Sequence, residues 1–368
     1  MKLKLVDRYL FKQVLTATIV CVFLFVIVWI APETLFNTIR DTIKGIWSIP
    51  VAIKIILCKI PEVIDRALPV GLLLGCLFTF DKLSKDFELT ILRGVGVSFV
   101  RIIMMPVILS ILLTFVCFYV QNTLIPKATT TIKTITNSVR EGYFVHTIKD
   151  ENGNLNKVII VSNFNSKGEI DSVSMLDFNK SQYNELSALD KITISRNAEN
   201  LGDKWRLYDI TEYKLSSSGI FQHIASTNYI DIYNPRQANT VYKLMIYSLA
   251  KQKEFNIEEL KNYINLLKQE DFTDEYNYYK NKYIQRYAHC SMCILFTILG
   301  CLLGFSQPRE QRLFGFTIAI GIIFLYYITL PFFDMLAEKS ILSPWITALI
   351  QPFLILVSIL CIKKIKDL

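Results

Sequence analysis

The amino-acid sequence predicts an α-helical membrane protein with six transmembrane helices and an inserted extracytoplasmic β-sandwich or jelly-roll domain. Three observations lead to this fold class. The 368 residues have a mean hydropathy of +0.36, whereas the polar surface of soluble domains brings this average below zero. Apolar runs of bilayer length flank a long polar middle stretch, and that stretch alternates in the period of β-strands. All eight cysteines lie outside it, which excludes a disulfide framework.

Each predicted span is a run of about 20 predominantly apolar residues, the length that crosses a hydrocarbon core of roughly 30 Å. Five runs carry charges only at their ends, and a sixth is uncharged only from Ala67 onward. The segment before it, Val51 to Pro61, alternates apolar residues with lysines and predicts a separate interfacial helix. The first run is too long for a signal peptide, so we expect a membrane anchor. In chain order the spans are 14–31, about 62–80, 102–120, 288–305, 313–333 and 346–362.

The distribution of Lys and Arg in the short connections predicts that both termini are cytoplasmic. With that orientation the cytoplasmic segments hold 13 basic residues and the opposite short loops hold five. The middle stretch holds equal numbers of basic and acidic residues, so the formal net charge of +8 belongs to the membrane part. This balance argues against nucleic acid as a partner.

The predicted domain organisation is residues 1–121 for spans one to three, 122–284 for the outside domain, and 285–368 for spans four to six. Turn signals separate alternating segments within the outside domain. Asn256 resembles the capping residue of a short helix, and the tyrosines after it are expected to form an interfacial aromatic belt. The predicted strands are 157–164, 170–178, 189–199, 204–215 and 224–233.

The sequence indicates no catalytic, metal or cofactor site. No P-loop motif occurs, so ATP hydrolysis would belong to another subunit. The three histidines are scattered over two domains, which does not support a zinc or acid–base constellation. Cys290 and Cys293 form a close pair at the head of span four, and we interpret them as small residues that allow helix packing.

The connection between spans two and three, residues 81–98, is too long for a simple turn. Leu89, Ile91 and Leu92 together with Glu88 and Arg93 give it the pattern of a short amphipathic helix that ends at Gly94 and offers an exposed apolar face beside a carboxylate. One interpretation is a helix that lies on lipid. The other is a coupling helix, within about residues 82–96, that docks in a groove of a cytoplasmic motor subunit, with Glu88 pairing with an arginine there.

With these segments in view, the chain resembles the LptF/LptG (YjgP/YjgQ) family of permeases of the lipopolysaccharide-export ABC transporter. The resemblance depends on Asp7-Arg8-Tyr9 before span one, on Leu68 to Gly75 in span two, and on Phe87 to Ser98. The layout of three spans, an outside β-rich domain and three more spans extends it over essentially the whole chain. Gly71 and Gly75 also have a small-xxx-small spacing, which suits close helix packing within the subunit or a moving gate.

The resemblance implies two such permeases bound to a dimer of the ATPase LptB, which extract lipopolysaccharide or a related glycolipid from the bacterial inner membrane. The lipid would enter between span one of one subunit and span five of the other and pass to a periplasmic bridge of the LptC/LptA type. Glu88 falls on the family's coupling-helix glutamate. Arg40 and Lys44 are the nearest equivalents of the family's phosphate-binding basic residues, although Glu33 stands where a lysine is expected. Phe316 and Phe324 on span five would line an apolar wall for acyl chains.

Three other classes remain open at this point. A mechanotransmitting ABC permease would have four spans, and six are predicted here. A membrane-anchored sensor or assembly factor would leave Glu88 without a role and would bind no ATPase. A membrane enzyme would need an acid–base or metal cluster, which the sequence does not indicate.

Overall fold

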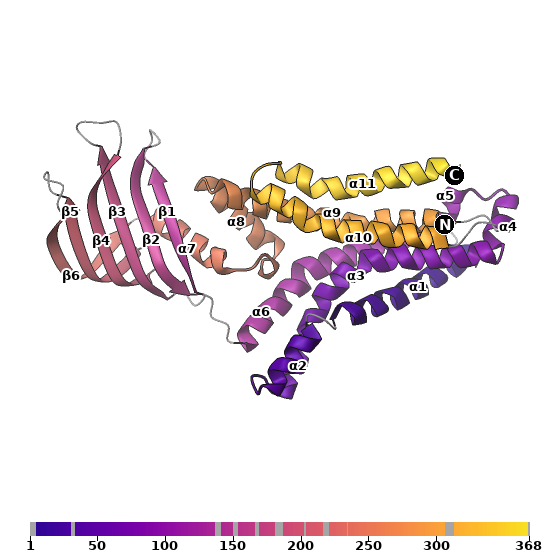
Figure 1. Cartoon of the computed structure of the whole chain (residues 1–368), viewed down its shortest axis with the longest axis horizontal. Coiled ribbons are helices and arrows are strands. Elements are labelled where there is room, and N and C mark those ends of the chain that lie inside the picture. The colour runs from indigo at the N-terminus through magenta and orange to yellow at the C-terminus, as the bar shows by residue number, and fades with distance from the viewer. Residues whose placement is uncertain are drawn as a thin grey trace. The chain divides into compact units, whose positions relative to one another are not determined.

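The structure of the chain is a computed structural model, which divides into two compact units (Figure 1). The helical unit comprises residues 1–136 and 252–368, and the β unit comprises residues 137–251. The outside domain was expected to span 122–284, and the segments 122–136 and 252–284 belong to the helical unit instead. The described residues are 5–30, 34–136, 141–149, 154–165, 169–180, 187–201, 204–215, 221–233, 235–305 and 313–366.

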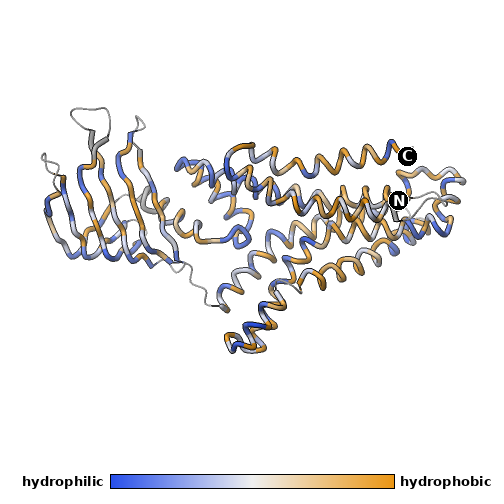
Figure 2. Tube along the Cα trace, in the orientation of Figure 1, coloured by the Kyte–Doolittle hydropathy of each residue, from blue (hydrophilic) through white to orange (hydrophobic). Residues whose placement is uncertain are grey.

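Six helices of the helical unit are long and apolar enough to cross a membrane, as the sequence predicted. Every backbone polar group of a helix is satisfied within the segment, which is why long apolar runs fold this way in lipid. The third continues from α5 through a π-helical turn, η2 (Val120–Leu124), into α6 (Ile125–Ile135). Figure 2 shows hydrophobic residues along the long helices of this unit. These helices are α1 (Leu5–Ile30), α3 (Ile49–Lys85), α5 (Phe99–Tyr119), α9 (Thr273–Gly304), α10 (Leu313–Glu338) and α11 (Pro344–Ile365).

The separate interfacial helix predicted at Val51 to Pro61 is wrong, because this segment is the first part of α3. Pro61 and Pro69 both lie inside that helix without ending it. Its charges pair along the same helix: Glu62 Oε2 accepts from Lys59 Nζ at 3.3 Å, and Glu62 Oε1 accepts from Arg66 Nη2 at 3.0 Å. Pairs at these spacings let a charged segment continue the helix. Two prolines inside a transmembrane helix are tolerated where neighbouring groups satisfy the freed carbonyls.

Helices α3 and α9 form the centre of the helical unit. The apolar windows of α3 and α9 are 78% and 67% buried, whereas those of α1 and α10 are 17% and 11% buried. Glycines bring α3 close to two neighbours: Gly71 and Gly75 face Val22 and Thr18 of α1, and Gly300 of α9 faces the Leu73 carbonyl. The close approach confirms that the Gly71 and Gly75 spacing serves packing within the subunit. Three shorter helices complete the unit: α2 (Phe36–Ile43), α4 (Glu88–Gly94) and α8 (Ile257–Gln269).

Asn256 caps α8 as predicted, because its side chain accepts hydrogen bonds from the backbone N–H groups of Glu258 and Glu259. The Glu259 carboxylate accepts a hydrogen bond from the Asn256 N–H, which completes a capping box. The tyrosines that follow do not precede span four but lie on α9 itself, and Tyr279 packs edge-on against Tyr263 of α8 at 4.8 Å between ring centroids. The start of α9 is therefore held to α8 by aromatic contacts.

The β unit is an antiparallel sheet whose six described strands follow the chain in order, β1-β2-β3-β4-β5-β6. Helix α7 (Pro235–Leu249) contacts β1 and β5 and shields apolar side chains of the sheet. Val161 and Val173 face each other across β2 and β3 and are fully buried. The strands are β1 (Glu141–Lys149), β2 (Leu155–Asn165), β3 (Ile170–Lys180), β4 (Ser187–Asn200), β5 (Lys204–Leu215) and β6 (Phe221–Tyr233).

An inserted β-rich domain is confirmed, and the five predicted strands correspond to β2 through β6. The described strand order is that of a meander, whereas the Greek keys of a jelly roll would place strands distant in sequence side by side. Strand β1 was not predicted. The available signal was residue type, because Tyr143, Phe144 and Val145 are aromatic or β-branched residues, which are enriched in strands.

Candidate functional site

The segment predicted as a coupling helix forms α4, which follows α3 after a sharp turn. Phe87 adopts the left-handed conformation at φ 57°, and this reverses the chain directly before Glu88. After α4, Gly96 has φ 88°, a conformation that glycine adopts without a steric penalty. The Ser98 side chain then caps α5 by accepting from the Arg101 backbone N–H. Two turns with fixed geometry thus hold α4 between two spans.

The four residues predicted to couple to an ATPase divide between two surfaces of α4. Leu89 is 1% exposed and packs in the core of the spans, and Leu92 packs partly against the same core. The Arg93 guanidinium lies over the Phe305 ring at 5.4 Å from its centroid. Glu88 is half-buried and accepts a hydrogen bond from the Tyr9 hydroxyl at 3.1 Å.

The outward surface of α4 is apolar. Ile91 is 63% exposed and Val95 is 79% exposed, and Phe87 at the turn before the helix is also exposed. We call Phe87, Ile91 and Val95 the α4 apolar surface. The sequence predicted an exposed apolar face on this helix and included Ile91 in it, but it did not separate Ile91 from Leu89 and Leu92, which pack against the spans.

Two contacts attach the start of α1 to this region. The buried Asp7 carboxylate accepts a hydrogen bond from Arg101 Nη2 of α5 at 2.7 Å, and Tyr9 contacts Glu88 as described. Asp7 and Tyr9 are part of the motif that carried the family resemblance. Their partners are 94 and 79 residues away in the chain, so no local pattern indicated these pairs.

The residues predicted to contact lipid lie in different parts of the helical unit. Arg40 lies on α2 and Lys44 directly after it, and both are exposed. Figure 1 shows α2 at the end of the helical unit opposite α4. Phe316 is partly buried and packs against Phe78 at 5.7 Å between ring centroids. Phe324 is exposed on α10. Glu33, the departure noted from the family pattern, lies outside the described residues.

A cavity of about 400 Å³ lies among the spans, with walls from α1, α3, α9, α10 and α11. Its lining carries the cations Arg66, Lys253, Lys282 and Arg286 together with Glu62 and Asp65. Charged groups inside a membrane are expensive unless they are paired or functional. Glu62 pairs with Arg66 and with Lys253. The Arg286 guanidinium donates to Asn122 Oδ1 at 3.0 Å and to the Gln252 and Phe255 carbonyls at 3.2 and 2.9 Å.

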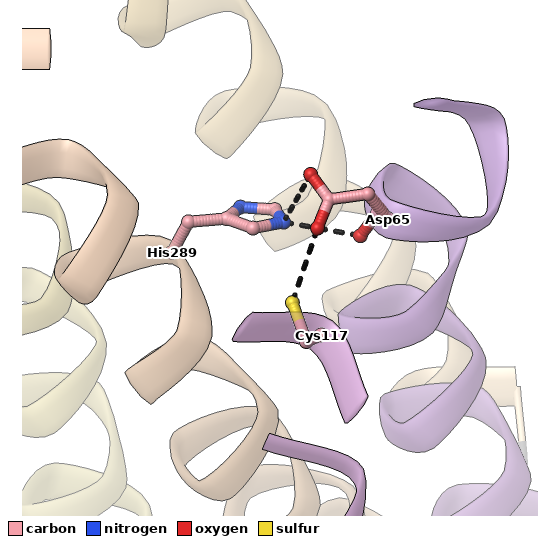
Figure 3. Close-up of side chains that lie close together, drawn as sticks. All are labelled: Asp65, Cys117 and His289. Atoms are coloured by element: carbon pink, nitrogen blue, oxygen red, sulfur yellow. Dashed lines mark hydrogen bonds and ion pairs between the residues drawn. The ribbon is translucent and has the colours of Figure 1, made fainter. Parts of the chain in front are cut away.

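Three side chains from three spans meet at the edge of this cavity (Figure 3). The Cys117 thiol of α5 donates to Asp65 Oδ1 of α3 at 3.2 Å, and His289 Nε2 of α9 lies 3.6 Å from Asp65 Oδ2. The cluster was not predicted, because the three residues are far apart in the chain. Cys290 and Cys293, which were assigned to helix packing from the sequence, are both buried beside Cys117 and Leu68.

A bundle of six candidate spans with a polar cavity, a short helix between two spans and an inserted β-sheet defines a multi-pass membrane protein of the permease class. Residues 8–363 match the family described as the lipopolysaccharide export system permease LptF/LptG, and the chain belongs to that family. It is therefore a permease of the lipopolysaccharide export system and is not itself catalytic. No curated protein matches the chain.

Proposed function

We propose that this permease is driven by a cytoplasmic LptB-like ATPase dimer that docks on α4. The observation that carries the proposal is the α4 apolar surface beside Glu88. Exposed apolar side chains next to a carboxylate suit a groove on a protein partner that offers an arginine. Leu89 and Leu92 then act as anchors that transmit the movement of α4 to the spans, and Glu88 makes the contact with the partner.

The connection from α4 to α1 supports a path for that movement. Glu88 contacts Tyr9, and Arg101 contacts Asp7, so two pairs join the coupling region to the start of the first span. A rigid displacement of α4 would therefore displace α1. In the proposal this changes the opening through which lipid enters.

The lipid path is proposed to run between α1 of this subunit and α10 of a second LptF/LptG-type permease, which is the same chain or a sister chain. The apolar outer surfaces of α1 and α10 support this, because few of their side chains are covered within the subunit. Phe316 and Phe324 would contact acyl chains along α10. Arg40 and Lys44 would bind the phosphates of lipopolysaccharide or a related glycolipid, since guanidinium and ammonium groups form strong charge-assisted bonds with phosphate.

The same proposal places the chain in the bacterial inner membrane with both termini in the cytoplasm and the β unit in the periplasm. One end of the helical unit carries residues from both ends of the chain and from the α4 region, namely Asp7, Glu88, Arg101 and Lys366. Lys366 belongs to this group because it donates a hydrogen bond to the Leu302 carbonyl at the end of α9. The β unit would pass lipid to a bridge protein of the LptC/LptA type. Among the described strands, β1 and β6 are the sheet edges to which a partner strand can add.

Replacement of Glu88 tests the coupling role. Glu88→Ala and Glu88→Lys should reduce the amount of ATPase that copurifies with the full chain by at least tenfold and abolish lipopolysaccharide export in cells. Tyr9→Phe separates docking from transmission: it leaves the Glu88 carboxylate in place and should keep ATPase copurification, while it removes one of the two contacts that join the coupling region to α1. Normal copurification and export in both Glu88 variants would contradict the assignment.

Charge reversal tests the phosphate contacts. Arg40→Glu together with Lys44→Glu should reduce photo-crosslinking of glycolipid to α1 severalfold, because two cations that attract the phosphates become repulsive. Lys363→Glu changes an exposed cation at the other end of the helical unit and should leave crosslinking unchanged. Equal crosslinking in the double variant and the control would leave these residues without a lipid role.

A further inference from the structure

We propose that Asp65, Cys117 and His289 bind one divalent transition-metal ion of the Zn²⁺ type and thereby join α3, α5 and α9. The carboxylate, thiol and imidazole are the three kinds of side chain that coordinate zinc. Each offers one ligand atom, and these three atoms all lie within 4.8 Å of one another. Figure 3 shows them directed toward a common point from three different spans.

The spacing fits tetrahedral coordination. With metal–sulfur bonds of about 2.3 Å and metal–nitrogen or metal–oxygen bonds of about 2.0–2.1 Å, neighbouring ligand atoms lie roughly 3.3–3.6 Å apart. Cys117 Sγ lies 3.2 Å from Asp65 Oδ1, and His289 Nε2 lies 3.6 Å from Asp65 Oδ2. These two contacts involve different oxygens of the carboxylate, and the three ligand atoms lie within 4.8 Å of one another, so side-chain rotation would bring one carboxylate oxygen, Sγ and Nε2 around a single ion.

The surroundings prepare the imidazole for a metal. His289 Nδ1 forms a hydrogen bond with the Tyr326 hydroxyl at 3.0 Å, which orients the ring and leaves Nε2 toward Asp65. A second hydrogen bond of this kind accompanies most metal-binding histidines. Nε2 also lies 3.0 Å from the Asp65 carbonyl oxygen, to which it donates its proton in this arrangement. Metal binding at Nε2 would use the other tautomer, in which Nδ1–H donates to the Tyr326 hydroxyl. Cys290 Sγ lies 3.8 Å from Cys117 Sγ and adds a soft donor atom nearby.

Charge also favours the ion. A carboxylate in a transmembrane helix carries a large desolvation penalty, and a cationic partner reduces it. One divalent cation balances the carboxylate of Asp65 and the thiolate of Cys117, so the occupied site is neutral. Metal binding would release the thiol proton. The nearby Arg286 guanidinium donates its hydrogen bonds to Asn122 and two backbone carbonyls and interacts with Asp65 through electrostatic attraction alone.

An entry path exists on one side. Asp65 and His289 both line the cavity of about 400 Å³, whereas Cys117 is fully buried behind them. An ion can thus enter through the cavity, and a water molecule from the cavity side can complete the tetrahedron. Occupancy would fix α3, α5 and α9 to one another while α1, α10 and α11 line the remaining wall. The site would make a rigid scaffold against which outer spans move.

Metal titration of the purified full-length chain tests the proposal. The protein, stripped with a chelator, is titrated with Zn²⁺ for elemental analysis and with Co²⁺ as a coloured probe. We expect about one ion per chain, a thiolate-to-cobalt charge-transfer band, and a higher melting temperature with Zn²⁺. Cys117→Ser and His289→Gln should weaken binding at least tenfold and remove the thermal shift. Cys361→Ser changes an exposed thiol elsewhere and should behave like the wild type.

Several results would overturn the proposal. Binding far below one ion per chain, a cobalt spectrum without the thiolate band, or equal affinity in Cys117→Ser would each exclude this site. Asp65→Asn guards against misfolding, because it keeps the size of the side chain and removes only its charge. A variant that elutes as a single species and melts like metal-free wild type is folded, so its loss of binding reports on the site. The readouts require no ATPase or lipid and are independent of the proposed coupling.

Discussion

The backbone of α1 passes close to Gly75 of α3, and replacement of this glycine by alanine should separate the two helices. A Cβ at Gly75 would lie 2.8 Å from both Cα and N of Thr18. The optimum separation of nonbonded carbon atoms is about 3.5–4.0 Å, so the α1 backbone would have to withdraw by roughly 0.7–1.2 Å. Backbone atoms cannot rotate away as a flexible side chain can. The variant therefore overpacks the contact between the first two spans.

The size of the effect follows from a matched pair of substitutions. Overpacking costs about 1–3 kcal/mol. Replacing a helical glycine by alanine also stabilises the helix by about 1 kcal/mol, which partly hides that cost. Gly321 lies inside α10, and a Cβ at this position would meet nothing within 4 Å, so Gly321→Ala gains the helix preference without the clash. The difference in stability between the two variants then comes from the overpacking alone.

Thermal unfolding in detergent, followed with a thiol-reactive dye, measures that difference. Cys76 and Cys301 are fully buried in the spans and react only when the helices separate. At roughly 2–4 °C per kcal/mol, Gly75→Ala should unfold at least about 2 °C below Gly321→Ala. Equal midpoints for the two variants would show the reasoning to be wrong, because the close approach of α1 to α3 would then carry no energetic cost.

Two further predictions concern ion pairs. Arg101→Ala removes the guanidinium that donates to buried Asp7, so it should cost about 1.5–3 kcal/mol and lower the melting temperature of the helical unit in the same dye assay. In the β unit, hydrogen bonds from Arg206 and then Lys204 hold the pKa of Asp231 well below its usual range. Their stabilisation is complete above the unfolded pKa of about 3.9 and is lost as the pH falls through the lower folded pKa. Pepsin should therefore cleave within residues 204–233 more readily in Asp231→Asn than in the wild type. This difference should be largest at the upper end of the acid range and should become smaller as the pH falls.

Each of these predictions has a control in the chain. Arg8→Ala removes an exposed guanidinium next to Asp7 and should leave the melting temperature unchanged. An equal loss in both arginine variants would point to general charge effects rather than the pair. Asp190→Asn in β4 neutralises an acidic residue of the same sheet away from Arg206. A pH-independent difference between Asp231→Asn and wild type would contradict the assignment of the pair.

The sequence predicted elements well and contacts poorly, for a physical reason. An apolar run, or an alternation of apolar and polar residues, reflects the environment of a single segment. This information is enough to predict the six spans and strands β2 to β6. The α3 helix was divided wrongly, because Lys54 and Lys59 suggested an interface, whereas Glu62 pairs with Lys59 and with Arg66 along one continuous helix. Interactions between segments leave no local pattern. Cys117 is 52 residues from Asp65, and His289 is 224 residues from it.

The glycines of α9 have a consequence for the order of assembly in the membrane. A Cβ at Gly300 would lie 2.4 Å from the Leu73 carbonyl oxygen, and one at Gly304 would lie 2.5 Å from that of Leu77, so α3 and α9 meet along their backbones. The β unit separates these two helices in the chain, and its neighbouring strands are consecutive, so the sheet can form progressively during synthesis. The first three spans are therefore in the bilayer before synthesis of the β unit is complete. Until α9 arrives, the surface of α3 around Leu73 and Leu77 is open to lipid or to a chaperone.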